Sequence, residues 1–191
     1  MDLGDKRRNK RAIKMMEGFS AMPTASIPQA CGDWADTMGA YRFFENDTFE
    51  WTDILQPHIQ SSMGRMATHE VVLCIQDTTE LDFNGQQARG LGPLSYEAQR
   101  GMYLHPTYAV STAREPLGVL DAWMWARQAK NGDGTRPGVS ESLRWTEGYE
   151  RLAEIAPLLP QTRLVYLADR EADIMEPMVR ATATDDVLIV Q

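Results

Sequence analysis

The sequence predicts an α/β (α+β) protein in which a small helical N-terminal region precedes a mixed β-sheet that is covered by helices. Three observations support this prediction. Residues 1–66 carry apolar side chains at helical spacing, and three strand-like segments follow one another from residue 71 onward. Helical and strand-like segments then alternate up to residue 190. Consecutive strands followed by helix, strand, helix and strand are the order expected of a mixed sheet with helices packed on it.

The N-terminal region is predicted to hold three helices. The first begins after Asp5, a favourable N-cap, and ends at "PTASIP". The second runs from Asp33 to Glu45 and the third from about Trp51 to Met66. The first helix has an apolar stripe at helical spacing, formed by Ala12, Ile13, Met15, Met16 and Phe19. The second has Trp34, Met38, Tyr41 and Phe44 on one side.

The pattern changes at Val71–Ile75, a continuous apolar run of strand length that is typical of a buried central strand. A glycine-rich stretch, "NGQQARGLGPLS", follows it. Residues 107–112 and 116–127 are predicted to be two further strands, joined by the turn-like "AREP". "KNGDGTRPG" is then predicted to be a loop.

A helix, a strand, a second helix and a last strand complete the predicted order. The helix spans residues 140–156, with Ser140 as its cap and Leu143, Tyr149 (or Trp145), Leu152 and Ile155 facing inward. Residues 163–168 form the fourth strand, 170–183 a helix and 187–190 the fifth strand. The ribonuclease H-like sheet has this order, and other mixed sheets have it too.

Composition excludes several classes of protein. The net charge of −8 argues against a generic nucleic-acid binder, but residues 1–14 hold six basic and two acidic side chains, a local charge of +4. That uneven charge is compatible with local DNA contact, but on charge alone a solvated helix face is the better explanation. No apolar run approaches the roughly 20 residues of a membrane helix, and the N-terminus does not resemble a secretory signal. Cys31 and Cys74 are expected to be reduced thiols in a cytoplasmic protein.

Two carboxylates follow apolar strands. Asp77 comes just after the first predicted strand and Asp169 just after the fourth. Two carboxylates at one sheet edge would repel each other unless they share a divalent cation, Mg²⁺ or Mn²⁺, that prefers oxygen ligands. Two such ions could clamp the attacking and leaving oxygens of a phosphodiester. The alternative is that Asp77 caps a turn and Asp169 caps the next helix. The three histidines, His58, His69 and His105, show no metal-ligand spacing.

Seven segments, in order along nearly the whole chain, then indicate a family. They are "DLGDKRRNKR", "SIPQACGDWADTMGAYRFFEN", "IQDTTELDF", "RGMYLHPTYAVS", "PLGVLDAWMWAR", "ESLRW" and "LADREADI". Together they resemble the bacterial cut-and-paste DDE transposases of the insertion-sequence-four group, the transposon-five-like kind.

The resemblance implies a helical domain, residues 1–66, that binds transposon-end DNA, and a ribonuclease H-like catalytic domain, residues 70–191. Asp77 and Asp169 match the first two members of a metal-binding carboxylate triad for cleavage and strand transfer with Mg²⁺ (or Mn²⁺). Glu171 and Asp173 are expected to support that site, and Glu141 and Trp145 match a helix motif expected to serve packing. The cations expected to contact DNA are Lys6, Arg7, Arg8, Lys10, Arg11, Arg42 and Arg170.

The third carboxylate of the family is a glutamate in a motif of Tyr, Arg, Glu and Lys on a late helix, and residues 1–191 do not contain it. We therefore expect a truncated transposase with an incomplete sheet, weak metal binding and no cleavage on its own. The alternative is a non-catalytic DNA-binding remnant, or an inhibitor of full-length transposase. The expected partners are transposon-end DNA and a full-length transposase or a second copy of the chain. The expected location is the bacterial cytoplasm, in association with the nucleoid and without a membrane.

Overall fold

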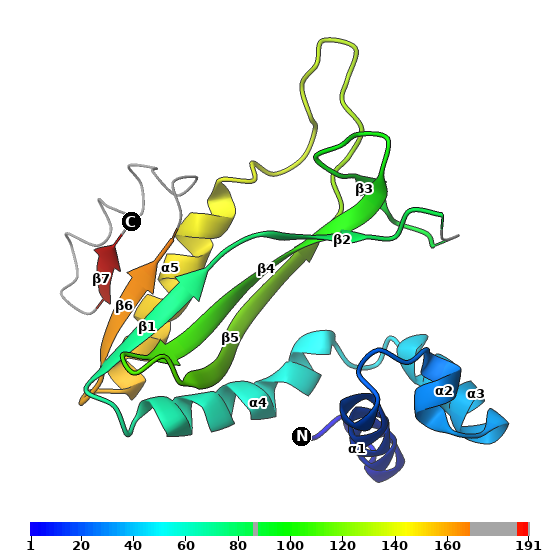
Figure 1. The fold of residues 1–191 in the computed structure, drawn as a ribbon, viewed down its shortest axis with the longest axis horizontal. Coiled ribbons are helices and arrows are strands. Elements are labelled where there is room, and N and C mark those ends of the chain that lie inside the picture. The colour runs from blue at the N-terminus through cyan, green and yellow to red at the C-terminus, as the bar shows by residue number, and fades with distance from the viewer. Residues whose placement is uncertain (86–87, 169–186, 191) are drawn as a thin grey trace. The chain divides into compact units, whose positions relative to one another are not determined.

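The computed structural model describes residues 1–85, 88–168 and 187–190, and the chain divides into two compact units (Figure 1). Unit 1 is Met1–His58 and unit 2 is Ile59–Gln191. The division falls inside a helix, α4 (Trp51–Met66), which has the bounds predicted from the sequence. Each unit is described by itself below.

Unit 1 is helical, as predicted. Helix α1 (Lys6–Ala21) begins after Asp5, whose carboxylate accepts the backbone N–H of Arg7 at 2.6 Å. Helix α3 (Trp34–Phe44) begins after Asp33, which accepts the N–H of Asp36 at 2.7 Å. The predicted N-cap Asp5 is confirmed, and Asp33, predicted as the first residue of its helix, is the N-cap of α3.

A short helix that the sequence analysis missed, α2 (Ile27–Cys31), lies between α1 and α3. Ser26 and Gln29 form a capping box at its start, and Pro28 occupies its first turn, where a missing N–H costs nothing. The prolines in "PTASIP" therefore end one helix and open another.

The core of unit 1 is small, and it uses other helix faces than the apolar pattern suggested. Its buried members are Leu3, Ala12, Met15, Ala40 and Phe43. Ile13 and Met16, which belong to the predicted stripe of α1, are 48% and 44% exposed. Each follows a buried residue by one position, about 100° further round the helix, and so points away from the core.

Helix α3 shows the same inversion. The aromatic side chains Trp34, Tyr41 and Phe44, which share the predicted apolar side, are exposed, and Trp34 is 76% exposed. The buried positions of α3 are instead Thr37, Ala40 and Phe43, spaced three residues apart.

The sheet of unit 2 has five principal strands. They are β1 (Val71–Gln76), β4 (Arg100–Ser111), β5 (Pro116–Trp125), β6 (Arg163–Leu167) and β7 (Val187–Val190). Strand β4 pairs antiparallel with β1 on one side and with β5 on the other. Strand β6 pairs parallel with β1 and with β7. The order β5-β4-β1-β6-β7, with β4 the antiparallel member, is that of a ribonuclease H-like sheet, so the predicted fold class is confirmed.

Two short strands, β2 (Thr79–Asp82) and β3 (Gly92–Pro93), also pair with β4. The sequence analysis missed both, and it began β4 seven residues too late. The first half of β4 buries Gly101, Tyr103 and His105 on alternate positions. Because glycine and histidine occupy inward positions there, the strand lacks the apolar alternation that would reveal it.

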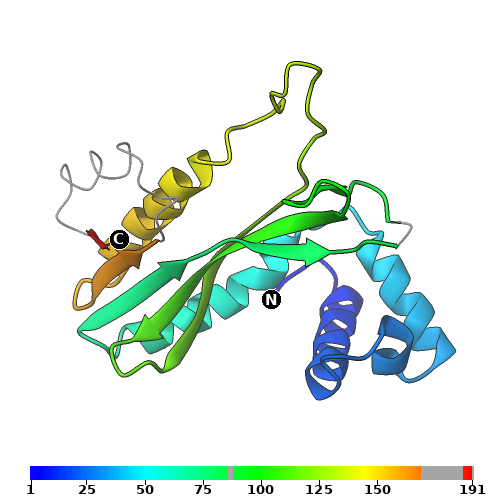
Figure 2. The same ribbon diagram turned by 45° about the horizontal axis from the view of Figure 1, so that its top comes forward.

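Helix α5 (Leu143–Ile155) lies along the sheet beside β1 and β6 (Figure 2). Its buried residues include Trp145, Tyr149 and Leu152, which join the strands in the main core. Two predictions here are wrong. The N-cap is Ser142 rather than Ser140, and Leu143 is 37% exposed because it precedes the turn that contacts the sheet.

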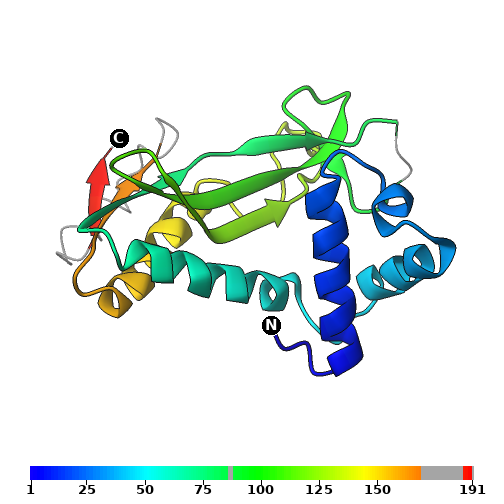
Figure 3. The same cartoon turned by 60° about the horizontal axis from the view of Figure 1, so that its bottom comes forward.

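The second half of α4 packs on β5 within unit 2 (Figure 3). Arg65 Nε donates to the carbonyl of Leu117 at 2.6 Å. Gly118 allows this approach, since a Cβ there would lie 2.1 Å from Ser62 Oγ. The predicted helix 170–183 lies outside the described residues, and among the described helices none is long and apolar enough to cross a membrane.

Candidate functional site

Asp77 lies in a break within one antiparallel ladder. Strands β1 and β2 both pair with β4, and the pairs Gln76↔Thr107 and Thr79↔Leu104 belong to the same register. That register places Asp77 opposite Pro106. Proline has no N–H to donate, so the ladder opens at this point. Asp77 is therefore in a gap between two strands, not in the turn that the alternative interpretation expected.

The Asp77 side chain is exposed, and its Oδ1 accepts the N–H of its neighbour Thr78 at 2.7 Å. A cavity of about 200 Å³ opens beside it. The residues that line this cavity are Asp77, Thr78, Glu80, Ser95, Tyr103, Arg127, Glu141 and Arg144.

The residue before Asp77 is fixed by buried polar contacts. The Gln76 amide donates to Thr107 Oγ1 at 2.5 Å, and its Oε1 accepts the Tyr166 hydroxyl at 2.6 Å. All three side chains are almost fully buried. Burial raises the pKa of the Tyr166 phenol, which therefore stays protonated as the donor. A buried polar group that loses its partner costs more than the bond itself contributes, so Gln76 is strongly held.

The residue after Asp77 is fixed from the same side. Thr78 Oγ1 lies 2.8 Å from His105 Nδ1, and His105 Nε2 lies 3.3 Å from Gln76 Oε1. The edge of the Trp145 indole supports the imidazole ring, with 4.4 Å between centroids. One buried histidine thus connects the two residues that flank Asp77, so the backbone around the exposed carboxylate is held from beneath.

Gly148 on α5 makes this arrangement possible. A Cβ at that position would lie 1.9 Å from Gln76 Nε2, which is far inside contact distance. The helix can approach the sheet over Gln76 only because residue 148 has no side chain.

The far wall of the cavity is the ion pair of Arg127 and Glu141, with the guanidinium stacked on the Tyr103 ring. Arg127 donates to both carboxylate oxygens of Glu141 at 2.5 Å, and also to the Tyr103 hydroxyl. Its guanidinium lies over the Tyr103 ring, 4.1 Å from the centroid. The hydrogen bond from Arg127 holds the pKa of Glu141 below its ordinary value. Glu141, expected to serve packing, is thus the anchor of this wall.

Glu80 completes the polar lining. It accepts the backbone N–H of Ser95 at 2.8 Å and the Tyr103 hydroxyl at 3.0 Å. The hydrogen bonds from Ser95 lower the pKa of Glu80. Sequence reasoning missed Glu80, Tyr103 and Arg127 as a group. The sequence held one clue to this group. Glu80 lies in "TELDF", within strand β2, and Arg127 ends "WMWAR", just after strand β5.

As a divalent metal site, the described lining is incomplete. Glu80 and Glu141 are held by N–H and O–H donors, so Asp77 is the carboxylate best placed to offer an oxygen to a cation. In the part of the chain that the structure describes, no three His, Cys, Asp or Glu side chains gather as metal ligands. Asp169, Arg170, Glu171 and Asp173 lie outside the described residues.

The predicted DNA-contacting cations of unit 1 fall into two groups. Lys6, Arg7 and Lys10 are exposed on α1, and Arg42 is exposed on α3. The helical spacing of Lys6 and Lys10 puts both on one face.

The other two predicted DNA-contacting residues of α1, Arg8 and Arg11, bind groups within unit 1. Arg8 donates to the Leu3 carbonyl at 2.7 Å and to Thr48 Oγ1 at 2.6 Å. Arg11 pairs with Asp36 at 2.7 Å. Asp36 also binds Lys14, and the hydrogen bond from Lys14 lowers the Asp36 pKa.

The N-terminal part of the chain matches the model of a known protein family. Residues 1–49 match the family model described as "Transposase DNA-binding". Two solved structures have similar chains. A Mos1 transposase paired-end complex with the left transposon end has 9% identity and a TM-score of 0.36, covering 93% of this chain and 57% of that one. A Mos1 strand transfer complex has 9% identity and a TM-score of 0.31, covering 94% and 57%. This chain therefore spans little more than half the length of either, and scores this low carry no conclusion about function.

Proposed function

We propose that this chain serves DNA transposition, with unit 1 binding transposon-end DNA and unit 2 contributing to phosphodiester chemistry. The match of residues 1–49 to a transposase DNA-binding family is the observation that carries the proposal. The exposed cations of α1, Lys6, Arg7 and Lys10, support it, because phosphate contacts supply most of the affinity for DNA. They add a local positive charge to an otherwise acidic chain.

The chemistry we propose for unit 2 centres on Asp77 and Asp169 as ligands of Mg²⁺ or Mn²⁺. Strands β1 and β6 are parallel, and their described ladder ends at the pair Ile75↔Leu167. In the sequence, Asp77 and Asp169 each come two residues after this pair. Carboxyl ends of adjacent parallel strands share one sheet edge, which supports a common cation. The bound metal would activate the nucleophile and stabilise the leaving oxygen of a phosphodiester.

In this proposal, the protein's own groups prepare the metal ligand. Pro106 opens the ladder at Asp77, and His105 ties Thr78 to Gln76 beneath it. The carboxylate is therefore presented to the cavity on a backbone that is held on both sides. Such a preorganised ligand needs little rearrangement when the cation binds.

We further propose that residues 1–191 alone bind DNA without cleaving it, because two carboxylates are one fewer than the triad implied by the sequence resemblance. Metal binding to them should be weak. Completion of the site would then need a third carboxylate that residues 1–191 do not supply.

The test is a binding and cleavage assay with a duplex carrying the terminal repeat that flanks the gene, against a scrambled duplex of equal length. Replacing Lys6, Arg7 and Lys10 with alanine should weaken binding at least tenfold. It should also lower the slope of log affinity against log salt by about three. The matched control replaces three exposed arginines of unit 2, Arg89, Arg114 and Arg163, and should change affinity much less. Equal losses in the two triple variants would contradict the assignment to α1. Cleavage in Mg²⁺ that disappears in Asp77→Ala would contradict the proposal that this chain is inactive alone.

A further inference from the structure

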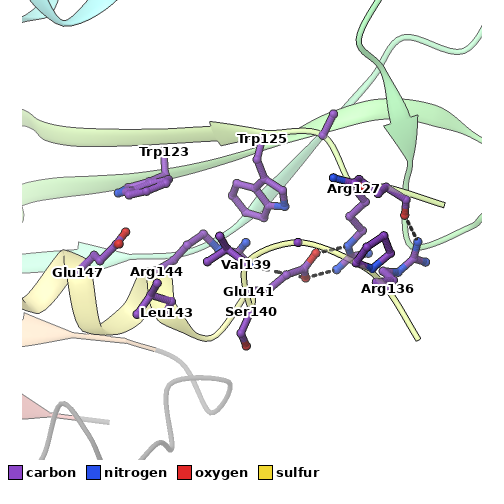
Figure 4. A pocket seen from close by; sticks show the side chains of 14 residues that line it. Trp123, Trp125, Arg127, Arg136, Val139, Ser140, Glu141, Leu143, Arg144 and Glu147 are labelled. Atoms are coloured by element: carbon purple, nitrogen blue, oxygen red, sulfur yellow. Dashed lines mark hydrogen bonds and ion pairs between the residues drawn. The ribbon is translucent and has the colours of Figure 1, made fainter. Parts of the chain in front are cut away.

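A second cavity, of about 350 Å³, lies between β5 and the start of α5 (Figure 4). Trp123 and Trp125 line it from the strand, and Leu143, Arg144 and Glu147 line it from the helix. Its volume is at the lower end of the roughly 300–1,000 Å³ typical of small-ligand sites. It is wide enough for one planar ring system and far too small for a duplex. We call it the Trp123 slot.

The strand side of the slot offers a rigid aromatic surface. Trp125 stacks on Tyr103, with 5.1 Å between ring centroids and 15° between planes. Arg144 lies over the other face of Trp125, 3.3 Å from the centroid. Both faces of Trp125 are therefore occupied. Trp123, two residues earlier on the same side of β5, is 37% exposed and is the ring available for stacking by a ligand.

The helix side offers one polar recognition group. Glu147 lies on α5 one turn after Leu143, and its carboxylate group lines the slot. A carboxylate accepts hydrogen bonds and donates none, so it favours a ring that carries an N–H₂ group. Cytosine, adenine and guanine carry such a group, whereas thymine offers only N3–H, which lies between two carbonyl oxygens that would repel the carboxylate.

The rim of the slot carries excess positive charge. Arg136 and Lys130 both bind the single carboxylate of Glu97, each at 2.6 Å. Two cations on one anion leave a net charge of +1 beside the opening, in a chain whose overall charge is −8. A phosphate attached to a base within the slot would meet this positive rim.

The Trp123 slot also adjoins the Asp77 cavity. The two cavities share Arg127, Glu141 and Arg144 in their linings. A DNA strand with one phosphate beside Asp77 could place a neighbouring base in the slot, on the other side of the shared Arg127–Glu141 wall.

We propose that the Trp123 slot binds one unpaired, amino-bearing base (cytosine, adenine or guanine) of the DNA strand that lies at the Asp77 cavity. Trp123 stacks on the base, Glu147 accepts its amino group, and the Arg136–Lys130 rim faces its phosphate. This inference rests on the proposed function only in taking DNA as the ligand, and it adds a subsite that reads an unpaired base.

The experiment measures binding of 5′-labelled single-stranded decamers dC10, dA10 and dT10 by fluorescence anisotropy. We expect dC10 and dA10 to bind about fivefold or more tightly than dT10. Trp123→Ala should weaken dC10 and dA10 about fivefold to a hundredfold, because it removes the stacking surface. Trp123→Phe should restore part of the loss. Glu147→Gln should abolish the preference, because an amide can donate to thymine O4 as well as accept from an amino group.

Trp34→Ala is the matched control. Trp34 is a more exposed tryptophan in unit 1, and its loss should leave the ratio of dC10 to dT10 affinity unchanged. Equal affinity for all three decamers, no binding at all, or a preference that survives Trp123→Ala would each overturn the proposal. Circular dichroism of each variant shows that the fold is intact. Failure of the α1 triple variant to affect duplex binding would instead contradict the proposed function of unit 1 and leave the slot result standing.

Discussion

The two units of this chain place their polar and apolar groups in opposite ways. Unit 2 buries Gln76, His105 and Thr107 in a hydrogen-bonded network beneath its sheet edge. Unit 1 has a small core and exposes the aromatic rings of Trp34 and Phe44. A buried polar network demands fixed geometry, whereas an exposed aromatic face contributes little to its own fold. The difference is compatible with the proposed function, in which unit 2 holds a fixed site and unit 1 contacts DNA.

The largest expected contrast between the units is in thiol reactivity. Burial raises the pKa of Cys74 to about 12, so at pH 8 only about 1 thiol in 10,000 is ionised. Cys31 in unit 1 is only partly buried. A disulfide reagent at pH 8 should therefore modify Cys31 quickly, and Cys74 only when unit 2 opens. Mass spectrometry of timed samples checks this, and equally fast modification of both cysteines would show that unit 2 opens as readily as unit 1.

The second prediction compares two helix glycines within unit 2, Gly148 and Gly64. Gly148→Ala places a methyl group 1.9 Å from Gln76 Nε2 and should destabilise unit 2 by about 3 kcal/mol. Gly64→Ala, in the α4 helix, meets no atom within 4 Å and should stabilise the chain by about 0.5–1 kcal/mol. Unfolding of each variant in urea gives its change in the free energy of unfolding, with reaction of the Cys74 thiol as the signal that unit 2 has unfolded. A neutral Gly148→Ala would mean that the Gln76 network adapts and is not a fixed support.

The smallest expected effect is on stability, and it concerns the ion pairs that Asp36 forms in unit 1. The Asp36 pKa is lowered by its bonds to Lys14 and Arg11, so the ionised form is favoured in the folded state. The resulting stabilisation is present above the ordinary carboxyl pKa and is lost as pH falls through the lowered value. Asp36→Asn should remove the part of the stability that is lost at acid pH. At pH 7 it should change the thermal midpoint little, since ion pairs at the surface contribute little to stability.

The same substitution should tighten duplex DNA binding severalfold at low salt, because it releases two cations and removes an anion. Thermal scans between pH 3 and 7 and a salt-dependent binding curve measure the two effects. Weaker DNA binding by Asp36→Asn would indicate that Asp36 orients Lys14 and Arg11 toward DNA.

The sequence predicted the units unequally well. Apolar runs such as Val71–Ile75 and helix caps such as Asp5 predicted the longer helices and the buried strands, because burial of strands and satisfaction of helix ends leave strong local patterns. The helix faces of unit 1 were not predictable in this way. Ile13 and Trp34 follow the helical period, but both are exposed, because the helix face that becomes buried depends on tertiary packing that periodicity does not encode.

At the candidate site, the sequence predicted Asp77 and not the residues around it. The position of a carboxylate after an apolar strand is visible in the chain. The Arg127–Glu141 wall depends on residues 14 positions apart across a loop, and the support from Tyr166 comes 90 positions after Gln76. Such contacts follow from the sheet order, so they become visible only once the strands are paired.

That sheet order also has a consequence for synthesis on the ribosome. Helices α1, α2 and α3 contact one another over short sequence distances, so unit 1 can fold soon after it emerges. Strand β1 lies at the centre of the sheet, but its parallel partner begins 92 residues later, with Val71 opposite Arg163. Closing so long a segment is slow, and a parallel pair cannot form by local hairpin closure. The apolar strand that leads to Asp77 must therefore wait with one edge unpaired, and during translation it is the segment most exposed to aggregation and most in need of a chaperone.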